Sequence, residues 1–308
     1  MLKAEGLTRR YGDFVAARDV SFTIESGEVV GLLGHNGAGK TTVMKMLTGY
    51  LEPSSGSVTV DGINLSTAPL AVQSRLGYLP ESLPLYPEMS VAEYLAHAAR
   101  MRGLRPEDCV GWAVQETQLQ DKITDRVDTL SRGYKQRLGV AQAILHQPDI
   151  LVLDEPTNGL DPNQIQQMRE LILKLAEQAT VLLSTHIMQE VNAICSRTLM
   201  MRGGTLVMDK RLDELTEADT LKVRCGDLVE ASVLSSVPGV VAAQQQGNGE
   251  WLLRIDAKLD DVADRVAKAL VECSIAVYEL APQVKDLESV FRQVNEEQDE
   301  EQENTHAA

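Results

Sequence analysis

The chain has 308 residues, of which 44% are hydrophobic and 24% charged, the composition of a globular protein with a substantial core. Its formal net charge of −16, without a basic stripe, argues against nucleic acid as a partner. No apolar run reaches the ~20 residues of a membrane helix, and the N-terminus has no signal-peptide core, so we expect a cytoplasmic protein. The four cysteines are widely spaced, which favours reduced apolar cysteines over a metal site or disulfides.

The first part of the chain predicts a series of strands and then a strand–loop–helix unit. Alternating apolar residues predict short strands over 2–7, 20–24 and 57–60. A continuous apolar run predicts a buried strand over 29–33, and the apolar spacing of 43–47 predicts the helix after it.

The sequence GHNGAGKTT lies between that strand and that helix and fits the phosphate-binding pattern G-x-x-x-x-G-K-[ST]. Its glycines let backbone N–H groups point at phosphate oxygens, and the helix N-terminus adds positive charge. Lys40 is expected to reach the β- and γ-phosphates, and Thr41 to ligate Mg²⁺. The alternative, a plain glycine turn, is disfavoured by the strand and helix on either side. The residues expected to bind the nucleotide here are Gly34, Asn36, Gly37, Gly39, Lys40, Thr41 and Thr42.

The middle of the chain changes from helical to strand-like patterns. A helical subdomain is expected over about 88–147, where Pro and Ser residues mark helix starts. Continuous apolar runs over 150–153 and 181–184 predict strands of a parallel sheet that is buried on both faces. The apolar residues between these strands recur at helical spacing, which predicts a helix packed on the sheet.

Two carboxylates follow the strand at 150–153. Asp154 is expected to hold Mg²⁺, and Glu155 to act as the general base for attack of water on the γ-phosphate. Taken alone, an Asp-Glu pair after a strand is also compatible with a turn or a helix cap. The phosphate-binding pattern upstream favours the catalytic interpretation.

The composition changes after about residue 218, which predicts a second domain over 219–294. Its patterns follow the order β-α-β-β-α-β, with a last helix over 286–294, and predict a small α+β domain of the ferredoxin-like kind. Residues 295–308 carry six acidic residues and no basic one, so we expect a disordered acidic tail.

With the sequence Leu130-Ser131-Arg132-Gly133-Tyr134, the chain resembles the ATP-binding subunits of ABC transporters, whose signature is L-S-G-G-Q. The resemblance covers about residues 1–215 and extends to four further motifs. These are an aromatic residue before the phosphate-binding loop, the Q-loop region, the D-loop and the switch histidine, which correspond here to Tyr11, 77–81, 156–161 and His186.

The resemblance implies an α/β fold: a P-loop nucleotide-binding domain, residues 1–218, with a mixed sheet and a helical subdomain. It also implies ATP and Mg²⁺, and a dimer with a second copy or a paralogous subunit that sandwiches two ATP molecules. Ser131 and Gly133 of one copy would cap the γ-phosphate held by Gly34–Thr42 of the other. Tyr11 would stack on adenine, His186 would sense the γ-phosphate and Asp161 would couple the two sites.

Three residues depart from the family pattern: Arg132 replaces a glycine, Tyr134 replaces a glutamine, and Glu81 stands where the family usually has glutamine. Glu81 is expected to ligate Mg²⁺, since Mg²⁺ prefers hard oxygen ligands; the alternative is that it faces the permease or solvent.

The motifs most resemble the ABC-2-type export branch, including its gliding-motility and copper-maturation members. The function expected is therefore ATP hydrolysis that powers a separate integral-membrane permease, with the subunit peripheral on the cytoplasmic side of the membrane. The alternative is a non-transport ABC ATPase acting in translation or DNA repair. A purely regulatory ATP-binding domain would lack Glu155 or His186, and both are present.

Overall fold

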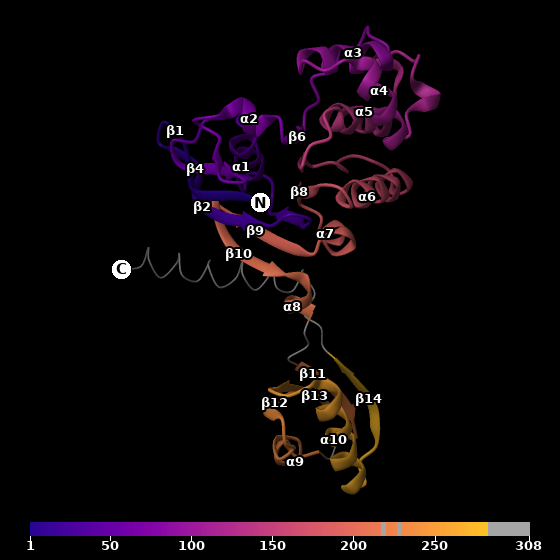
Figure 1. Cartoon of the computed structure of the whole chain (residues 1–308). Helices are drawn as coiled ribbons and strands as arrows, with labels where there is room; N and C mark the ends of the chain where they lie inside the picture. The colour runs from indigo at the N-terminus through magenta and orange to yellow at the C-terminus, as the bar shows by residue number, and fades with distance from the viewer. Residues whose placement is uncertain (217–219, 227–228, 283–308) are drawn as a thin grey trace. The chain divides into compact units, whose positions relative to one another are not determined.

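The computed structural model describes residues 1–216, 220–226 and 229–282. The chain divides into two compact units, Met1–Leu212 and Asp213–Ala308, which are described separately (Figure 1). Among the described residues, no helix is both long and apolar enough to span a membrane.

A six-stranded mixed sheet forms the centre of the first unit. Its strands, in spatial order, are β10 (Thr205–Arg211), β9 (Arg197–Arg202), β3 (Val29–Leu33), β8 (Thr180–Thr185), β7 (Ile150–Asp154) and β6 (Leu76–Leu79). Only the β9–β10 pair is antiparallel among these described strands. All residues of β7 and β8 are buried, as expected of parallel strands with both faces covered. The carboxyl ends of β3, β7 and β8 therefore lie at one edge of the sheet.

A second, antiparallel sheet packs against the first across one helix. Its order is β2 (Phe14–Ile24), β1 (Leu2–Tyr11), β4 (Ser55–Val60) and β5 (Ile63–Asn64). Helix α1 (Lys40–Leu47) contacts both sheets, and one hydrophobic core joins its buried residues Met44 and Leu47 to β1, β3 and β7. This packing fixes the start of α1, where the phosphate-binding loop ends.

Helices form the remainder of the first unit, and Figure 1 shows α3, α4 and α5 grouped together. Ser90 precedes α3 and forms a capping box with Glu93. A separate hydrophobic core under these helices includes buried residues of β7 and β8. The helices are α2 (Pro69–Gln73), α3 (Val91–Met101), α4 (Pro106–Glu116), α5 (Arg132–Ile144), α6 (Pro162–Ala176) and α7 (Met188–Ile194), with 3₁₀ turns at Gln120–Lys122 and Val127–Thr129. Helix α8 (Leu212–Thr216) follows, and all but its first residue belong to the second unit.

The second unit is an antiparallel sheet with its own core. Its elements are β11 (Thr220–Cys225), α9 (Ala231–Ser235), β12 (Val240–Gly247), β13 (Glu250–Ile255), α10 (Leu259–Glu272) and β14 (Val277–Pro282). The strand order β12-β13-β11-β14 is that of a ferredoxin-like domain. Helix α10 buries Val262, Val266 and Leu270 on one face against the core. The predicted fold class is confirmed, while the helix and tail predicted beyond residue 285 lie outside the described residues.

Candidate active site

The phosphate-binding loop runs from the end of β3 to the start of α1 and depends on glycine at two close contacts. A Cβ on Gly34 would lie 2.5 Å from the carbonyl oxygen of Met201, and one on Gly39 would lie 2.5 Å from that of Ala16. Gly39 also has a φ of 100°, in the left-handed region that favours glycine. The loop can therefore take this path only with glycine at both positions.

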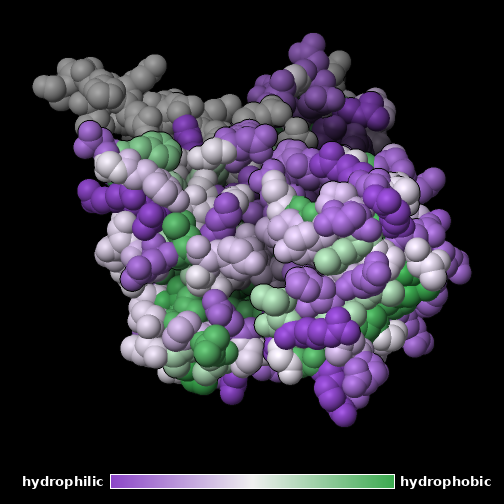
Figure 2. Space-filling model, turned by 90° about the horizontal axis from the view of Figure 1, so that it is seen from above, coloured by the Kyte–Doolittle hydropathy of each residue, from purple (hydrophilic) through white to green (hydrophobic). Residues whose placement is uncertain are grey.

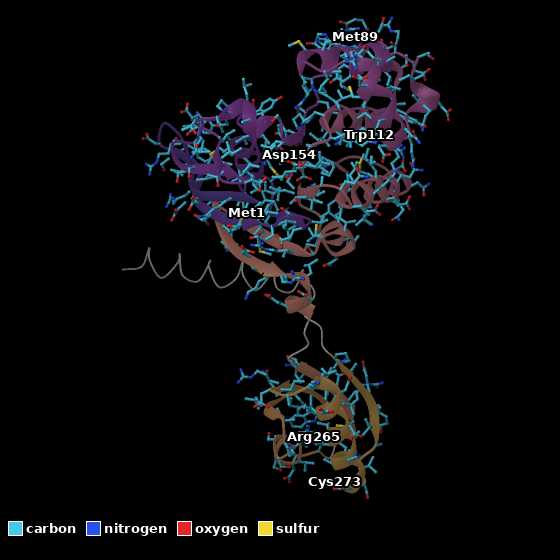
Figure 3. All side chains as sticks on the ribbon, in the orientation of Figure 1. Met1, Met89, Trp112, Asp154, Arg265 and Cys273 are labelled. Carbon is cyan, nitrogen blue, oxygen red and sulfur yellow. The ribbon has the colours of Figure 1, made fainter. Side chains whose placement is uncertain are left out.

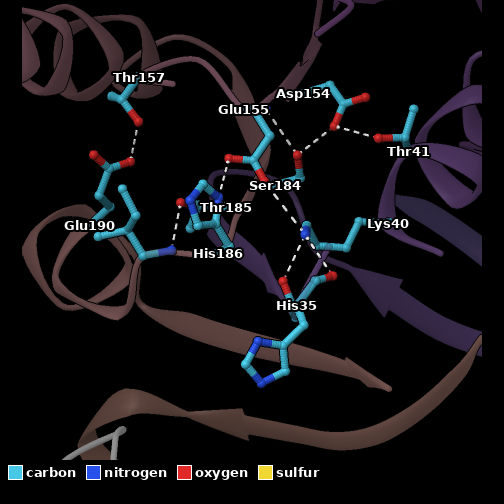
Figure 4. A network of polar contacts seen from close by, with 12 residues as sticks. His35, Lys40, Thr41, Asp154, Glu155, Thr157, Ser184, Thr185, His186 and Glu190 are labelled. Atoms are coloured by element: carbon cyan, nitrogen blue, oxygen red, sulfur yellow. Dashed lines mark hydrogen bonds and ion pairs between the residues drawn. The ribbon is translucent and has the colours of Figure 1, made fainter. Parts of the chain in front are cut away.

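Lys40 begins α1, and its buried side chain folds back into the loop. Its Nζ donates hydrogen bonds to the carbonyl oxygens of Gly34, at 2.7 Å, and His35, at 3.3 Å. The same ammonium lies 3.4 Å from Oε1 of Glu155 (Figure 4). A cation is thus held where the loop N–H groups would receive a phosphate.

Glu155 follows β7 and lies between two basic groups. While Oε1 faces Lys40, Oε2 lies 3.0 Å from Nδ1 of His186 at the end of β8. Glu155 has a φ of 50°, a conformation that costs a non-glycine residue on the order of 1–3 kcal/mol and recurs at functional sites. Its backbone N–H donates to Oγ of Ser184 at 2.9 Å, which stabilises this turn.

Asp154 lies deep in the first unit at the end of β7 (Figure 3). Its Oδ1 accepts hydrogen bonds from Oγ of Ser184, at 2.5 Å, and from Oγ1 of Thr41, at 3.3 Å. Its Oδ2 is buried without a hydrogen-bond partner among the described residues. A free carboxylate oxygen next to a threonine hydroxyl fits the oxygen ligands that Mg²⁺ prefers. Within the described residues no three His, Cys, Asp or Glu side chains form a metal site by themselves, so such an ion would also need nucleotide oxygens.

Lys40, Thr41 and Glu155 line one pocket of about 310 Å³, and Asp154 and His186 are not among its lining residues. The pocket contains loop residues 35–42, the carboxylate of Glu155 and the exposed Glu81, and also Phe14, an aromatic residue that the sequence motifs do not indicate. Tyr11, predicted to stack on adenine, does not line it; its ring is 49% exposed and lies 4.7 Å from the guanidinium of Arg9. The lining residues are Phe14, Ala16, His35, Asn36, Gly37, Ala38, Gly39, Lys40, Thr41, Thr42, Glu81 and Glu155.

Ser131, Gly133 and Asp161 line a separate pocket, of about 280 Å³, to which the phosphate-binding loop does not contribute. Two helices begin there: Oγ of Ser131 accepts from N–H of Tyr134 at the start of α5, and Asp161 accepts from N–H of Gln164 at the start of α6. Two helix N-termini facing one pocket favour an anion. Within one chain, then, the predicted capping residues and the phosphate-binding loop form two distinct surfaces.

Comparison with known proteins agrees with this geometry. A family model described as ABC transporter matches residues 17–158. The ABC transporter ATP-binding protein YdbJ of Bacillus subtilis, itself uncharacterised, is 33% identical over 94% of this chain and 94% of its own length. The chain belongs to the ABC transporter ATP-binding proteins. It is accordingly an ATPase subunit of the transporter type, and the family and activity predicted from its motifs are confirmed.

Other relatives and solved structures match a smaller share of the chain. The bacitracin transport ATP-binding protein BcrA of Bacillus licheniformis is 33% identical over 76% of this chain and 78% of its own. A solved ATP-binding subunit of an ABC transporter is 30% identical, with a TM-score of 0.63 over 70% of this chain and 91% of its own. The dimeric cassette MJ0796, bound to ADP and Pi, shares the fold at 22% identity and the same TM-score.

One buried acid of this ABC subunit, Glu190 on α7, was not anticipated from the sequence. Its Oε2 accepts a hydrogen bond from Oγ1 of Thr157, two residues after Glu155 (Figure 4). Burial raises the pKa of Glu190, and its Oε1 has no hydrogen-bond partner in the described part of the chain. This contact links the segment after Glu155 to the helix after His186. Its only signal in the sequence is an acid four residues beyond that histidine.

Proposed function

We propose that this subunit hydrolyses ATP in the pocket between the phosphate-binding loop and Glu155 and thereby drives export through a separate membrane permease. The observation that carries the proposal is the position of the Glu155 carboxylate, held between Lys40 and His186 at the edge of the pocket. A buried carboxylate whose two oxygens are each held by a basic side chain has the geometry of a general base that takes a proton from water.

ATP would compete for the ammonium that now pairs with this base. The phosphates of ATP would sit against the loop N–H groups and draw Nζ of Lys40 to themselves, which leaves Oε1 of Glu155 free to accept a proton from water. Nδ1 of His186 would keep the other oxygen in place. Thr41 and Asp154 would hold Mg²⁺, which supplies charge neutralisation at the phosphate oxygens. Glu81, in the same pocket, is proposed as a further ligand.

The second surface is proposed to act on a neighbouring subunit. Ser131 and Gly133 lie apart from the loop in their own chain, yet their pocket offers two helix N-termini to an anion. A second copy arranged head to tail would bring this pocket over the γ-phosphate of the first copy's ATP. Each ATP would then contact both copies, and Asp161 would lie between the two sites.

A groove of about 1000 Å³ on the first unit is proposed to receive the permease on the cytoplasmic side of the membrane. Among its lining residues are four tyrosines, and Asp and Glu are absent from them, although the chain as a whole is acidic. Figure 2 shows apolar side chains gathered in patches between hydrophilic ones on the face it displays. Apolar patches rimmed by polar residues are typical of interaction sites. The groove residues include Tyr50, Leu70, Tyr78, Tyr86, Tyr94, His97, Met101, Arg102 and His146.

Export is favoured by the relatives. Besides the bacitracin transport protein, the Nod factor export ATP-binding protein I of Rhizobium etli is 33% identical over 80% of this chain and 79% of its own. Relatives of this kind favour a transport role over one in translation or DNA repair.

The dimer and the hydrolysis can be tested on the purified chain. The ATPase rate per mole of protein should rise with protein concentration, because the site is complete only in the dimer. Ser131→Arg should abolish this rise while ATP binding by the monomer, measured by calorimetry, stays intact. A rate per mole that is independent of concentration, in a chain that stays monomeric with ATP, would refute the shared site.

A further inference from the structure

Arg132, one of the two residues that depart from the family signature, lies against Gly159 in the segment 156–161. A Cβ built on Gly159 would overlap the guanidinium of Arg132, with Nη2 at 2.7 Å. Gly159 has a φ of 71°, a backbone conformation that favours glycine, and a Cβ at this position would displace the guanidinium. The planar guanidinium thus covers the bare Cα of this residue.

The same helix start makes a second contact with the start of α6. A Cβ on Gly133 would lie 2.5 Å from Oε1 of Gln164, so the Gln164 side chain covers that glycine. Arg132 and Gly133 therefore hold the beginning of α5 to the segment 159–164 at two adjacent points. These contacts join the segments that carry Ser131 and Asp161, the two helix caps that line one pocket.

The structure shows the guanidinium of Arg132 in contact with Gly159. This residue is exposed, and among the described residues its guanidinium takes part in no hydrogen bond or ion pair. Its effect on the segment 156–161 is therefore one of packing. A glycine at position 132, as in the family signature, would leave the segment uncovered.

We propose that Arg132 is a positioning residue that clamps the segment 156–161 to the start of α5 and so presets the surface that caps the partner's ATP. The proposal rests on the head-to-tail dimer proposed above. If this segment is already ordered in the monomer, the chain loses less conformational entropy when the subunits associate. Loss of the clamp should weaken dimerisation without changing the affinity of the monomer for ATP.

The clamp itself can be measured in the monomer without nucleotide. Arg132→Ala should raise amide hydrogen exchange over residues 158–161 by about 10-fold, since the segment loses a restraint on its backbone. Lys135→Ala is the matched control, because it removes a cation from the same helix start and should leave this exchange unchanged. Exchange that is unaltered by Arg132→Ala overturns the clamp, whether or not the dimer exists.

The consequence for assembly is measured in chains that also carry Glu155→Gln, which keeps ATP intact. Arg132→Ala should weaken ATP-dependent dimerisation by about 10-fold in sedimentation experiments, while Arg132→Lys, which lacks the planar group, restores little. Gly159→Ala should weaken it as well, because the new Cβ displaces the guanidinium.

The double variant decides between a clamp and a direct action on phosphate. If Arg132 acts through Gly159, adding Arg132→Ala to the Gly159→Ala chain should weaken dimerisation scarcely further, because the contact is already lost and the backbone strain at position 159 is common to both chains. Fully additive effects overturn the proposal and indicate that Arg132 acts directly on the partner's ATP. A Glu155→Gln chain that never dimerises with ATP would refute the dimer, and the exchange measurement would still decide the clamp.

Discussion

Nδ1 of His186 and Oε2 of Glu155 lie 3.0 Å apart and join the ends of two neighbouring parallel strands, β8 and β7. The other carboxylate oxygen faces Lys40 at 3.4 Å, so the Glu155 carboxylate is held from both sides. Ser184 completes this arrangement, since its hydroxyl donates to Asp154 and accepts from the backbone of Glu155. One hydrogen-bond network therefore joins the proposed general base to the proposed metal site.

Glu155→Gln should bind ATP and hydrolyse it at least about 100-fold more slowly, because a general base typically contributes 10²–10⁴-fold. The amide keeps the shape of the side chain but cannot accept the proton. ATP binding by calorimetry and hydrolysis by phosphate release would be compared with Glu177→Gln, a change at an exposed glutamate. Wild-type turnover in the Glu155 variant would exclude it as the base.

Lys40→Ala should lose ATP affinity and activity together, because the ammonium contacts phosphate in the ground state and the transition state alike. Calorimetry would measure binding, and thermal melting would confirm folding, since the buried side chain also contacts two loop carbonyls. Lys45→Ala, at an exposed position of the same helix, is the control and should bind normally. Unchanged ATP binding in the Lys40 variant would contradict the loop assignment.

Glu81→Gln should raise the Mg²⁺ concentration needed for half-maximal hydrolysis and leave ATP affinity largely intact. The carboxylate lines the pocket beside Thr41, and an amide is a weaker ligand for a hard cation. The measurement is an Mg²⁺ titration of the ATPase rate in both proteins, in the assembled transporter. Superimposable curves with altered transport coupling alone would assign Glu81 to the permease contact instead.

His146, beyond the end of α5, should make stability depend on pH. Burial and the nearby Arg102 lower the pKa of His146 from 6.5 to about 4, and its Nε2 lies 3.0 Å from the carbonyl oxygen of Leu76. Because the unfolded chain takes up this proton at a higher pH, the contribution is complete above pH 6.5 and is lost as the pH falls toward 4.

Urea denaturation of the wild type and of His146→Gln, which stays neutral, tests this dependence. The wild type should lose more unfolding free energy between pH 7 and 4 than the variant does. Parallel losses in the two proteins would show that other groups account for the acid sensitivity.

Residues 219–294 should be dispensable for ATP binding. The hydrophobic core of the second unit contains only residues from Leu221 onward, and the two cores of the first unit end before it. A chain shortened to residue 218 should bind ATP with wild-type affinity in calorimetry and lose regulation or assembly. A shortened chain that folds, as shown by circular dichroism, yet fails to bind ATP would refute this separation.

The sequence by itself determined the features that depend on neighbouring residues. The loop around Lys40, the acids Asp154 and Glu155 after a buried strand, and the element order of the second unit all follow from local spacing, because strand, turn and helix patterns are properties of short segments. The motifs of the first unit also placed the chain in its family, although they did not indicate that Phe14 lines the pocket.

Only the tertiary structure decided how distant segments meet. The hydroxyl of Ser184 joins Asp154 to Glu155 because β8 lies beside β7 in one register, and no local pattern specifies that contact. The contact between the guanidinium of Arg132 and Gly159 likewise depends on how the starts of α5 and α6 pack together. Such contacts arise from the close packing of the whole core, which selects one arrangement among many that the local patterns allow.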